Sequence, residues 1–473
     1  MKTNNIIFTL DSYKQLHDVM YPDGTERVYS YVEARKGAEY DYSVFFGLQY
    51  AIKVWLEGVV ITKQLIDEAE PILKAHFKYS GDVWNRAKWD YIVEQHGGLL
   101  PVRIKAVPEG SKVPVDNIIM SIENTDPKCF WLTNALETLL QAYVWYATTV
   151  CTRSHSITET IRRFFQRTAE EGSLWLADFY LHDFAQRGTS CMEQAGLGGM
   201  AHLVNSRGTD TDMALPFAIE YYNANIEDLA FSVPASEHSI ATALGPDKEF
   251  DVTRRLIQKF PNGILSVVSD SYDISSAVLT YCTTLKQDIL ARNGKFVIRP
   301  DSPRFEGDTP AAQVLWIAEE LWNGFGGRVN SKGYRVLDSH VGIIYGDSLT
   351  ETQIEEILSL LEKHKFSAET CVFGCGGYLL QKVNRDTQRF AFKSSAQCRD
   401  GVWFDVFKQP KDASKASKRG KLKLVRQMTP EGSTFVTAPE SDPRPDVMEL
   451  VFENGVLLRN QDFDDVRKNA RKT

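Results

Sequence analysis

Between residues 179 and 377 the chain repeats one pattern, a short apolar run that ends in polar residues or glycine. The runs are FYLHDFAQRG (179–188), AFSVPASEH (230–238), ILSVVSDSYD (264–273), KFVIRPDS (295–302), HVGIIYGDS (340–348) and TCVFGCGG (370–377). Amphipathic segments such as 311–322 and 351–363 lie between them. Asp270 and Asp301 are 31 positions apart, and Asp347 follows 46 positions later. This is β/α-unit spacing, so the sequence predicts an α/β, barrel-like domain with parallel strands.

Polar residues gather where these predicted strands end: Asp183, Arg187, His238, Asp270, Arg299, Asp301, Asp347 and Gly376. In a β/α barrel the carboxyl ends of the strands converge on one site. A single aspartate at such a place is more often a helix cap than a catalytic group. Because six junctions carry polar residues, the pattern favours a functional site at this end of the barrel.

The stretch from Cys371 to Asp386 reads as a short buried strand, a glycine turn and a helix that begins at about Tyr378. Consecutive N–H groups in such a turn, together with a helix N-terminus, can bind phosphate. Arg385, two turns further on, would reach the same anion. The alternative is an ordinary glycine-rich connection between a strand and a helix, and this stretch alone does not decide between the two.

The composition limits the class of ligand and the cellular compartment. The 473 residues carry a net charge of −8, which argues against general nucleic-acid binding, so anionic ligands would need local Arg and Lys. Seven cysteines without a CxxC pair or zinc spacing predict reduced thiols in the cytoplasm, with no metal-ligand set assigned. The apolar run near the N-terminus is too short for a signal peptide. The apolar segment 135–150 contains Glu137, so it predicts a buried helix and no membrane span.

Residues 1–150 read as a separate α+β domain that the C-terminal segment 386–473 completes, with the barrel-like domain at 151–385. We expect a short strand within 1–20 that leads to an N-cap at Asp11 or Ser12, then a strand at 27–34 and helices across 43–78. Short antiparallel strands are expected across 101–121, and helices at 131–150 and 158–168. The C-terminal end predicts a strand, a turn at Asn454-Gly455 and a short helix.

The candidate residues offer carboxylates and arginines, and no nucleophilic Ser/His/Asp set. Asp270, Asp301 and Asp347 suit sugar hydroxyls or a hydrated Mg²⁺. Arg187, Arg299 and Arg385 suit phosphate or diphosphate. This mixture fits a diphosphorylated sugar that reacts by loss of diphosphate, with catalysis by positioning and electrostatics.

Eight ordered motifs carry a family resemblance: DSYK, LHDFAQRG, AHLVNSRGTDT, SVPASEHS, SVVSDSYDI, VIRPDS, YGDS and FGCGGYLLQK followed by RD. They resemble the nicotinamide phosphoribosyltransferases of the nicotinate/nicotinamide phosphoribosyltransferase family, from about Asp11 to Ala470. The resemblance implies a type II phosphoribosyltransferase barrel with an α+β domain built from both termini. It also implies transfer of phosphoribosyl from phosphoribosyl diphosphate to nicotinamide in a cytoplasmic homodimer with shared active sites, with Mg²⁺ and ATP.

The resemblance assigns roles around the nicotinamide. Phe184 would stack on one face of the pyridine ring and Tyr13 of the second subunit on the other. Asp210 would accept a hydrogen bond from the carboxamide and repel the carboxylate of nicotinate. Without the family, Phe184 would read as core packing and Asp210 as a turn former. Arg299, Pro300 and Asp301 would lie at the nicotinamide and the ribose.

The resemblance also assigns the groups that face phosphates. Arg187 and His238 would lie near the diphosphate, and Asp270 and Asp347 in the ribose and Mg²⁺ region. The 5′-phosphate would be held by Gly346, Gly376, Gly377 and Arg385, with Arg35, Lys393 and Lys415 contributed by the partner subunit. His238 matches the histidine that ATP can phosphorylate in this family; the alternative is a neutral histidine that only bonds diphosphate.

Other interpretations stay open. Pro303-Arg304-Phe305-Glu306 replaces the glycine-containing turn expected after IRPDS, so the loop beside Asp301 is expected to differ. A nicotinate phosphoribosyltransferase would share the fold, although Asp210 argues against the acid as substrate. A non-catalytic binding protein on the same fold and a Mg²⁺-dependent phosphohydrolase are further alternatives.

Overall fold

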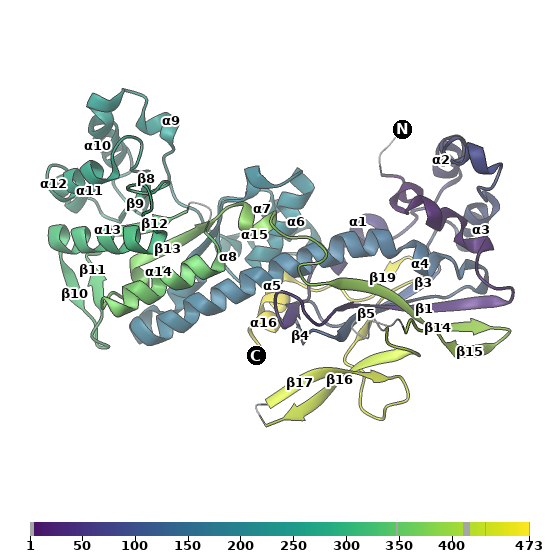
Figure 1. The fold of residues 1–473 in the computed structure, drawn as a ribbon. Helices are drawn as coiled ribbons and strands as arrows, with labels where there is room; N and C mark the ends of the chain where they lie inside the picture. The colour runs from purple at the N-terminus through teal and green to yellow at the C-terminus, as the bar shows by residue number, and fades with distance from the viewer. Residues whose placement is uncertain (1–3, 347–348, 410–416, 431, 473) are drawn as a thin grey trace. The chain divides into compact units, whose positions relative to one another are not determined.

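The computed structural model describes residues 4–346, 349–409, 417–430 and 432–472. The chain forms two compact units (Figure 1). Unit 1 comprises Met1–Thr152, Ala218–Ala224 and Val383–Thr473, and unit 2 comprises Arg153–Phe217 and Asn225–Lys382. The chain therefore passes between the units four times, after Thr152, Phe217, Ala224 and Lys382, where the sequence predicted changes at 150 and 385 only.

Unit 2 is built around a six-stranded parallel sheet of order β7-β6-β13-β12-β9-β8. Its strands are β6 (Leu181–Asp183), β7 (Gly208–Thr209), β8 (Leu265–Val268), β9 (Phe296–Arg299), β12 (Val341–Tyr345) and β13 (Cys371–Cys375). The parallel strands and the barrel-like α/β class are as predicted. Strand β7, two residues long, was not predicted because it lacks an apolar run.

The segment 230–238 was expected to be a full strand, but it forms only isolated parallel bridges. Phe231 bridges to Gly208 of β7, and Ala235 bridges to Ser266 of β8. This segment therefore connects the two outer strands of the sheet and curls it toward a barrel. Pro234 explains the missing ladder, because proline has no N–H to donate; its carbonyl accepts from Ser266 N at 2.9 Å.

Helices connect and cover the strands of unit 2. The longer ones are α6 (Met192–Leu203), α10 (Glu249–Lys259), α11 (Ile274–Cys282), α13 (Pro310–Phe325) and α14 (Glu351–Lys363). Shorter turns are η5 (Glu171–Phe179), η6 (Gln186–Gly188), α8 (Ile226–Leu229), α9 (His238–Ala241), η7 (Pro246–Lys248), α12 (Lys286–Leu290), η8 (Ala368–Thr370) and α15 (Gly377–Leu380), beside the hairpin β10 (Gly327–Val329) and β11 (Arg335–Leu337). Helix α14 begins with a capping box between Thr350 and Gln353, which satisfies its first N–H groups.

Unit 1 contains a seven-stranded antiparallel sheet of order β15-β14-β1-β5-β3-β18-β19. Its strands are β1 (Thr25–Ala34), β3 (Val102–Ala106), β5 (Asn117–Asn124), β14 (Phe390–Arg399), β15 (Val402–Asp405), β18 (Glu449–Glu453) and β19 (Val456–Leu457). Two further pairs are β2 (Tyr42–Val44) with β4 (Lys112–Pro114), and β16 (Leu422–Thr429) with β17 (Gly432–Pro439). The sheet thus joins strands from both ends of the chain.

The helices of unit 1 bury one apolar core with the sheet, in which Trp89 and Trp131 lie edge to face with ring centroids 4.9 Å apart. They are η1 (Ile6–Thr9), η2 (Ser12–Val19), α1 (Leu48–Trp55), α2 (Lys63–His76), η3 (Lys78–Ser80), α3 (Ala87–His96), η4 (Pro127–Cys129), α4 (Leu132–Ala135) and α16 (Phe463–Arg471). Helices α5 (Glu137–Thr168) and α7 (Ala214–Tyr222) each begin in one unit and end in the other. Among the described residues, no helix is long and apolar enough to span a membrane.

Three local predictions in unit 1 were wrong or incomplete. The expected strand before residue 20 is instead a pair of 3₁₀ helices, because the Asn5 side chain accepts from Ile7 N and starts a turn. Asp11 precedes η2 but makes no side-chain cap hydrogen bond. The two helices expected between 131 and 168 are mostly one continuous helix, α5.

Candidate active site

The carboxyl ends of the unit 2 strands surround a cavity of about 920 Å³. Its lining includes most of the predicted site residues of this unit: Phe184, Arg187, Asp210, His238, Arg299, Asp301, Gly346, Gly376 and Gly377. Each follows or ends a strand, or follows the bridging segment 231–235. The arrangement is the convergence of strand ends that the repeated sequence pattern indicated.

His238 lies between two carboxylates on this rim. Its Nε2 is 3.2 Å from Asp270 Oδ1, and its Nδ1 is 3.9 Å from Asp301 Oδ2. Asp270 also accepts a short hydrogen bond from the Ser302 hydroxyl, so its buried carboxylate is held from two sides. The imidazole remains about half exposed, at 47%. Both ring nitrogens thus lie near carboxylates, while about half of the side chain is exposed at the lining of the cavity.

Phe184 rests on two glycines at the neighbouring strands. A Cβ on Gly374 would lie 2.1 Å from Phe184 Cε2, and one on Gly346 would lie 3.0 Å from the same atom. Phe184 N donates to Cys375 O at 2.8 Å, which fixes the backbone on which the ring depends. The absence of side chains at both positions therefore decides where this aromatic ring can lie.

The turn that carries Phe184 is held by the buried Asp183. Its Oδ1 accepts from Ala185 N at 2.8 Å, and its backbone carbonyl accepts from Asp210 N at 2.9 Å. Its Oδ2 is buried beside the Thr211 hydroxyl, which acts to lower the pKa of the carboxyl. Burial raises the pKa of the Asp183 carboxyl to about 6.

Asp210 lies where the first cavity meets a second one of about 590 Å³, and both share Phe184, Asp210, Ala235 and Arg299 in their linings. Ser232 Oγ donates to Asp210 Oδ1 at 2.6 Å and so orients the carboxylate. The second cavity is more apolar, with Trp175, Phe179, His182 and Phe231 among its lining residues. Burial lowers the pKa of His182, although the charge of Asp210 opposes this.

The glycine turn has the predicted order of strand, turn and helix, but α15 is only one turn long. Its carboxyl end is held by the buried Arg153, which donates to Tyr378 O at 2.7 Å and to Lys382 O at 2.9 Å. Arg299 Nε is buried and has no hydrogen-bond partner among the described residues. The site thus combines partly exposed backbone at Gly376 and Gly377 with cationic side chains, which suits phosphate oxygens.

Other predicted residues lie in unit 1: Tyr13, Arg35, Arg385 and Lys393. Tyr13 is 59% exposed. Burial lowers the pKa of Lys393 and the positive charges of Arg35, Lys408 and Arg385 lower it further, against the opposing effect of Glu137. The structure therefore gathers three of the predicted phosphate ligands into one cationic group. Pro300 follows β9 and is buried, whereas Asp347 and Lys415 lie outside the described residues.

Comparison with known proteins identifies the family. The model of the nicotinate phosphoribosyltransferase (NAPRTase) family matches residues 179–447, which is more than half of the chain. The chain belongs to this family. Residues 5–104 also match the N-terminal domain of nicotinamide phosphoribosyltransferase. A nicotinamide phosphoribosyltransferase from Xanthomonas campestris is 43% identical over 99% of this chain and 98% of its own length. One from Acinetobacter baylyi is 34% identical over 98% of this chain and 96% of its own.

Solved structures agree on the fold. Nicotinate-nucleotide pyrophosphorylase from Pyrococcus furiosus superposes with a TM-score of 0.61 at 15% identity, over 99% of this chain and 96% of that one. Human nicotinic acid phosphoribosyltransferase gives 0.55 at 12% identity, over 98% and 92%. The predicted type II phosphoribosyltransferase fold is confirmed.

Two parts of the site were not predicted from the sequence. Ser232 stood inside a quoted motif, SVPASEHS, but its bond to Asp210 joins residues 22 positions apart. The apolar cavity is lined by strand residues that read as ordinary core until the barrel is assembled. Asp183 was noted as a strand-end aspartate, and its role in holding the turn required the fold.

Proposed function

We propose that the protein transfers the 5-phosphoribosyl group of phosphoribosyl diphosphate to nicotinamide, giving nicotinamide mononucleotide and diphosphate. The observation that carries this proposal is Asp210, a carboxylate oriented by Ser232 at the edge of the cavity beside Phe184. The relatives named nicotinamide phosphoribosyltransferase, alike over nearly the whole chain, support it.

Asp210 would determine the selectivity for nicotinamide over nicotinate. A carboxylate accepts a hydrogen bond from the NH₂ of nicotinamide, whereas it repels the carboxylate of nicotinate. Two like charges brought together in a confined site cost several kcal/mol. Phe184, seated on Gly346 and Gly374, offers a flat apolar face for the pyridine ring. Tyr13 of a second subunit would cover the other face in the homodimer that we propose.

The cationic groups of the site would bind the phosphates of the substrate. In the reaction the ring nitrogen of nicotinamide forms a bond to the anomeric carbon, and the bond from that carbon to the diphosphate oxygen breaks. The electron pair leaves with diphosphate, and positive charge ends on the pyridinium. Arg187 and Arg299 would bind the departing diphosphate, and Gly376 and Gly377 the 5′-phosphate. The cationic group around Lys393 would serve phosphates of the partner's site.

Mg²⁺ fits the carboxylates of this rim, since it takes one or two carboxylates and completes its coordination with water and phosphate oxygens. Asp301, whose side chain is 35% exposed, offers such a ligand, with Asp270 behind it. Bound there, Mg²⁺ would supply charge neutralisation for the diphosphate. The carboxylates themselves would stabilise positive charge that develops on the ribose.

His238 is the group that we propose ATP phosphorylates. With Nε2–H donating a hydrogen bond to Asp270, Nδ1 would keep its lone pair, 3.9 Å from Asp301 Oδ2. Attack by Nδ1 on the γ-phosphorus breaks the bond to the bridging oxygen and releases ADP. We place this chemistry in the cytoplasm, where the seven free cysteines would stay reduced.

The test is product formation by the purified protein with Mg²⁺, phosphoribosyl diphosphate and either nicotinamide or nicotinate, with and without ATP. We expect mononucleotide from nicotinamide and its loss in Asp210→Ala. Asp212→Asn, an exposed charge two residues away, serves as the matched control. Product from nicotinate alone would transfer the assignment to a nicotinate phosphoribosyltransferase, and no product from either would favour a binding protein.

A further inference from the structure

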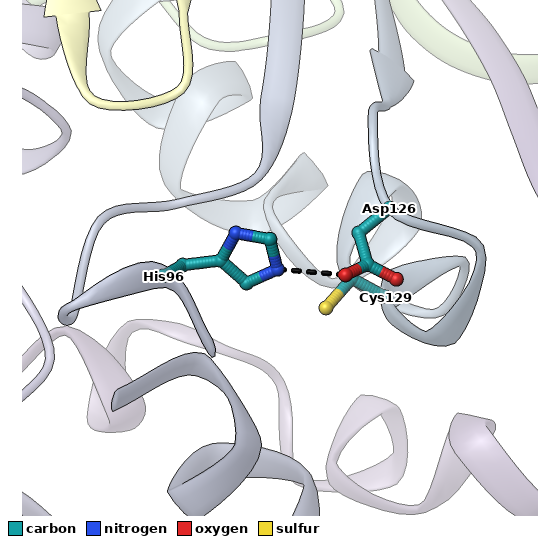
Figure 2. A group of neighbouring side chains, drawn as sticks. All are labelled: His96, Asp126 and Cys129. Atoms are coloured by element: carbon teal, nitrogen blue, oxygen red, sulfur yellow. Dashed lines mark hydrogen bonds and ion pairs between the residues drawn. The ribbon is translucent and has the colours of Figure 1, made fainter. Parts of the chain in front are cut away.

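Unit 1 contains a group of three possible metal ligands that the sequence did not suggest. His96, Asp126 and Cys129 each direct one donor atom to a common space, and these three atoms lie within 4.8 Å of one another. Figure 2 shows the imidazole of His96 facing the carboxylate of Asp126, with the sulfur of Cys129 beside them. We propose that these residues form a zinc site separate from the Mg²⁺ chemistry of unit 2.

The donor types select the metal. Nitrogen, oxygen and sulfur together are the ligand set of Zn²⁺, whereas Mg²⁺ and Ca²⁺ take oxygen ligands. Donors in a tetrahedral zinc site are about 3.5 Å apart. His96 Nε2 and Asp126 Oδ2, which lie 2.7 Å apart, would therefore separate by somewhat less than about an ångström. The widest pair of donors, within 4.8 Å, would close by at most about an ångström. Three protein ligands leave a fourth position for water. The partial exposure of His96, at 25%, and of Asp126, at 16%, gives an ion a path to the site.

The backbone fixes all three residues in advance. His96 is the last residue of α3, which Gly97 ends in the left-handed conformation at φ 61°. Asp126 and Cys129 are the first and last residues of the turn around η4, where Cys129 N donates to Asp126 O at 3.0 Å. A zinc ion would therefore link the end of α3 to the turn that follows β5, through His96 and Asp126, which are 30 positions apart in sequence.

Further contacts orient the ligands. Asp126 Oδ1 accepts from Lys128 N at 2.7 Å, and Oδ2 accepts from the Tyr91 hydroxyl at 2.9 Å and lies 2.7 Å from His96 Nε2. Carboxylates held by such second contacts are typical of metal sites. The Cys129 thiol is buried and makes no hydrogen bond to any described residue. The Cys129 sulfur therefore faces the other two ligands and makes no competing hydrogen bond with the described residues.

Binding would exchange protons for metal without any oxidation. Zinc–sulfur and zinc–nitrogen bonds form as the thiol loses its proton and His96 Nε2 loses the hydrogen that it shares with Asp126. Both protons pass to solvent or, for the imidazole, to Nδ1. The Asp126 carboxylate keeps its charge and exchanges the imidazole contact for the metal.

Cobalt is the probe, since Co²⁺ takes zinc sites and absorbs light. Metal-free protein is titrated with Co²⁺ in excess Mg²⁺, which occupies oxygen-only sites. We expect a sulfur-to-cobalt charge-transfer band that saturates at one Co²⁺ per chain and disappears when Zn²⁺ is added. Cys129→Ser should abolish the band, and His96→Gln should weaken Co²⁺ binding by at least about 100-fold. Tyr91→Phe should weaken binding by about 10-fold through loss of orientation.

Matched controls separate the site from general effects. Cys398→Ser removes another cysteine of unit 1, and His76→Gln removes an exposed histidine; both should bind Co²⁺ as the unmodified protein does. His96→Gln changes a partly exposed side chain, so it tests the proposal even if Cys129→Ser unfolds. Absence of the band in the unmodified protein, or a band unchanged in His96→Gln, would show a metal-free hydrogen-bonded cluster instead. The cobalt absorbance does not depend on phosphoribosyl transfer. A protein without that activity would therefore still give the same test of the zinc site.

Discussion

Replacing Gly374 with alanine is the sharpest test of how the barrel shapes its site. Gly374 lies in β13 opposite His182 and does not have a positive φ, so the backbone accepts alanine. The new Cβ would meet Phe184 Cε2 at 2.1 Å and Cδ2 at 2.4 Å. Carbon atoms in contact are about 3.5–4.0 Å apart, so the ring must move by roughly 1.5 Å. A misplacement of about 1 Å can cost about 100-fold in rate.

We therefore expect kcat/KM for nicotinamide to fall by about 100-fold in Gly374→Ala, mainly through KM, with the far-ultraviolet circular dichroism unchanged. Gly172→Ala is the control, because a Cβ there meets nothing within 4 Å. In a Phe184→Leu background the added methyl should cost much less, since the clashing ring atoms are gone. If Gly374→Ala retained kcat/KM within about threefold, or if its effect were the same in both backgrounds, Phe184 would not be seated by this glycine.

Three further predictions address charge and stability. Asp210→Asn should lower kcat/KM for nicotinamide by at least about 10-fold and raise the ratio of nicotinate to nicotinamide turnover, because the repelling charge is gone; an unchanged ratio would contradict the role of Asp210. Glu109→Ala should lower the free energy of unfolding by about 3 kcal/mol or more in urea titrations, since it strands two backbone N–H groups and the Tyr222 hydroxyl in the core, whereas Tyr222→Phe should cost about 1 kcal/mol. Burial raises the pKa of Asp183 to about 6, so the folded protein holds this proton more tightly than the unfolded chain does. The resulting contribution to the free energy of unfolding is present at low pH and is lost as pH rises through about 6. Unfolding of the unmodified protein compared with Asp183→Asn at about pH 4 and pH 7 should show a relative loss of at most about 3 kcal/mol at the higher pH, and equal pH profiles would refute it.

The sequence was most informative where structure is local. Apolar runs ending in Asp, Arg or glycine located β6, β8, β9, β12 and β13, because each such strand is defined by a few consecutive residues. The same logic placed Phe184, His238 and Asp301 around one cavity, since parallel strands bring their carboxyl ends together.

The sequence did not predict features that depend on residues far apart in the chain. The bridging segment 231–235 depends on the two outer strands of the sheet, and Pro234 replaces the expected strand with isolated bridges. Near the N-terminus, the side chain of Asn5 decided the local conformation against the β-like composition. His96 and Cys129 are 33 positions apart and share no spacing rule, so only the fold brings them together.

The sheet of unit 1 also has a consequence for synthesis. Strands β1, β3 and β5 are translated first, but β14, which pairs with β1, begins only at Phe390, 266 residues after β5 ends at Asn124. At about 5–20 residues per second, a nascent chain waits roughly 13–53 seconds for that strand to be made. During this interval β1 presents an unpaired edge, the feature that promotes association between chains. On the ribosome, the barrel can therefore finish folding before the domain that begins the chain, and chaperone demand should be greatest for the N-terminal strands.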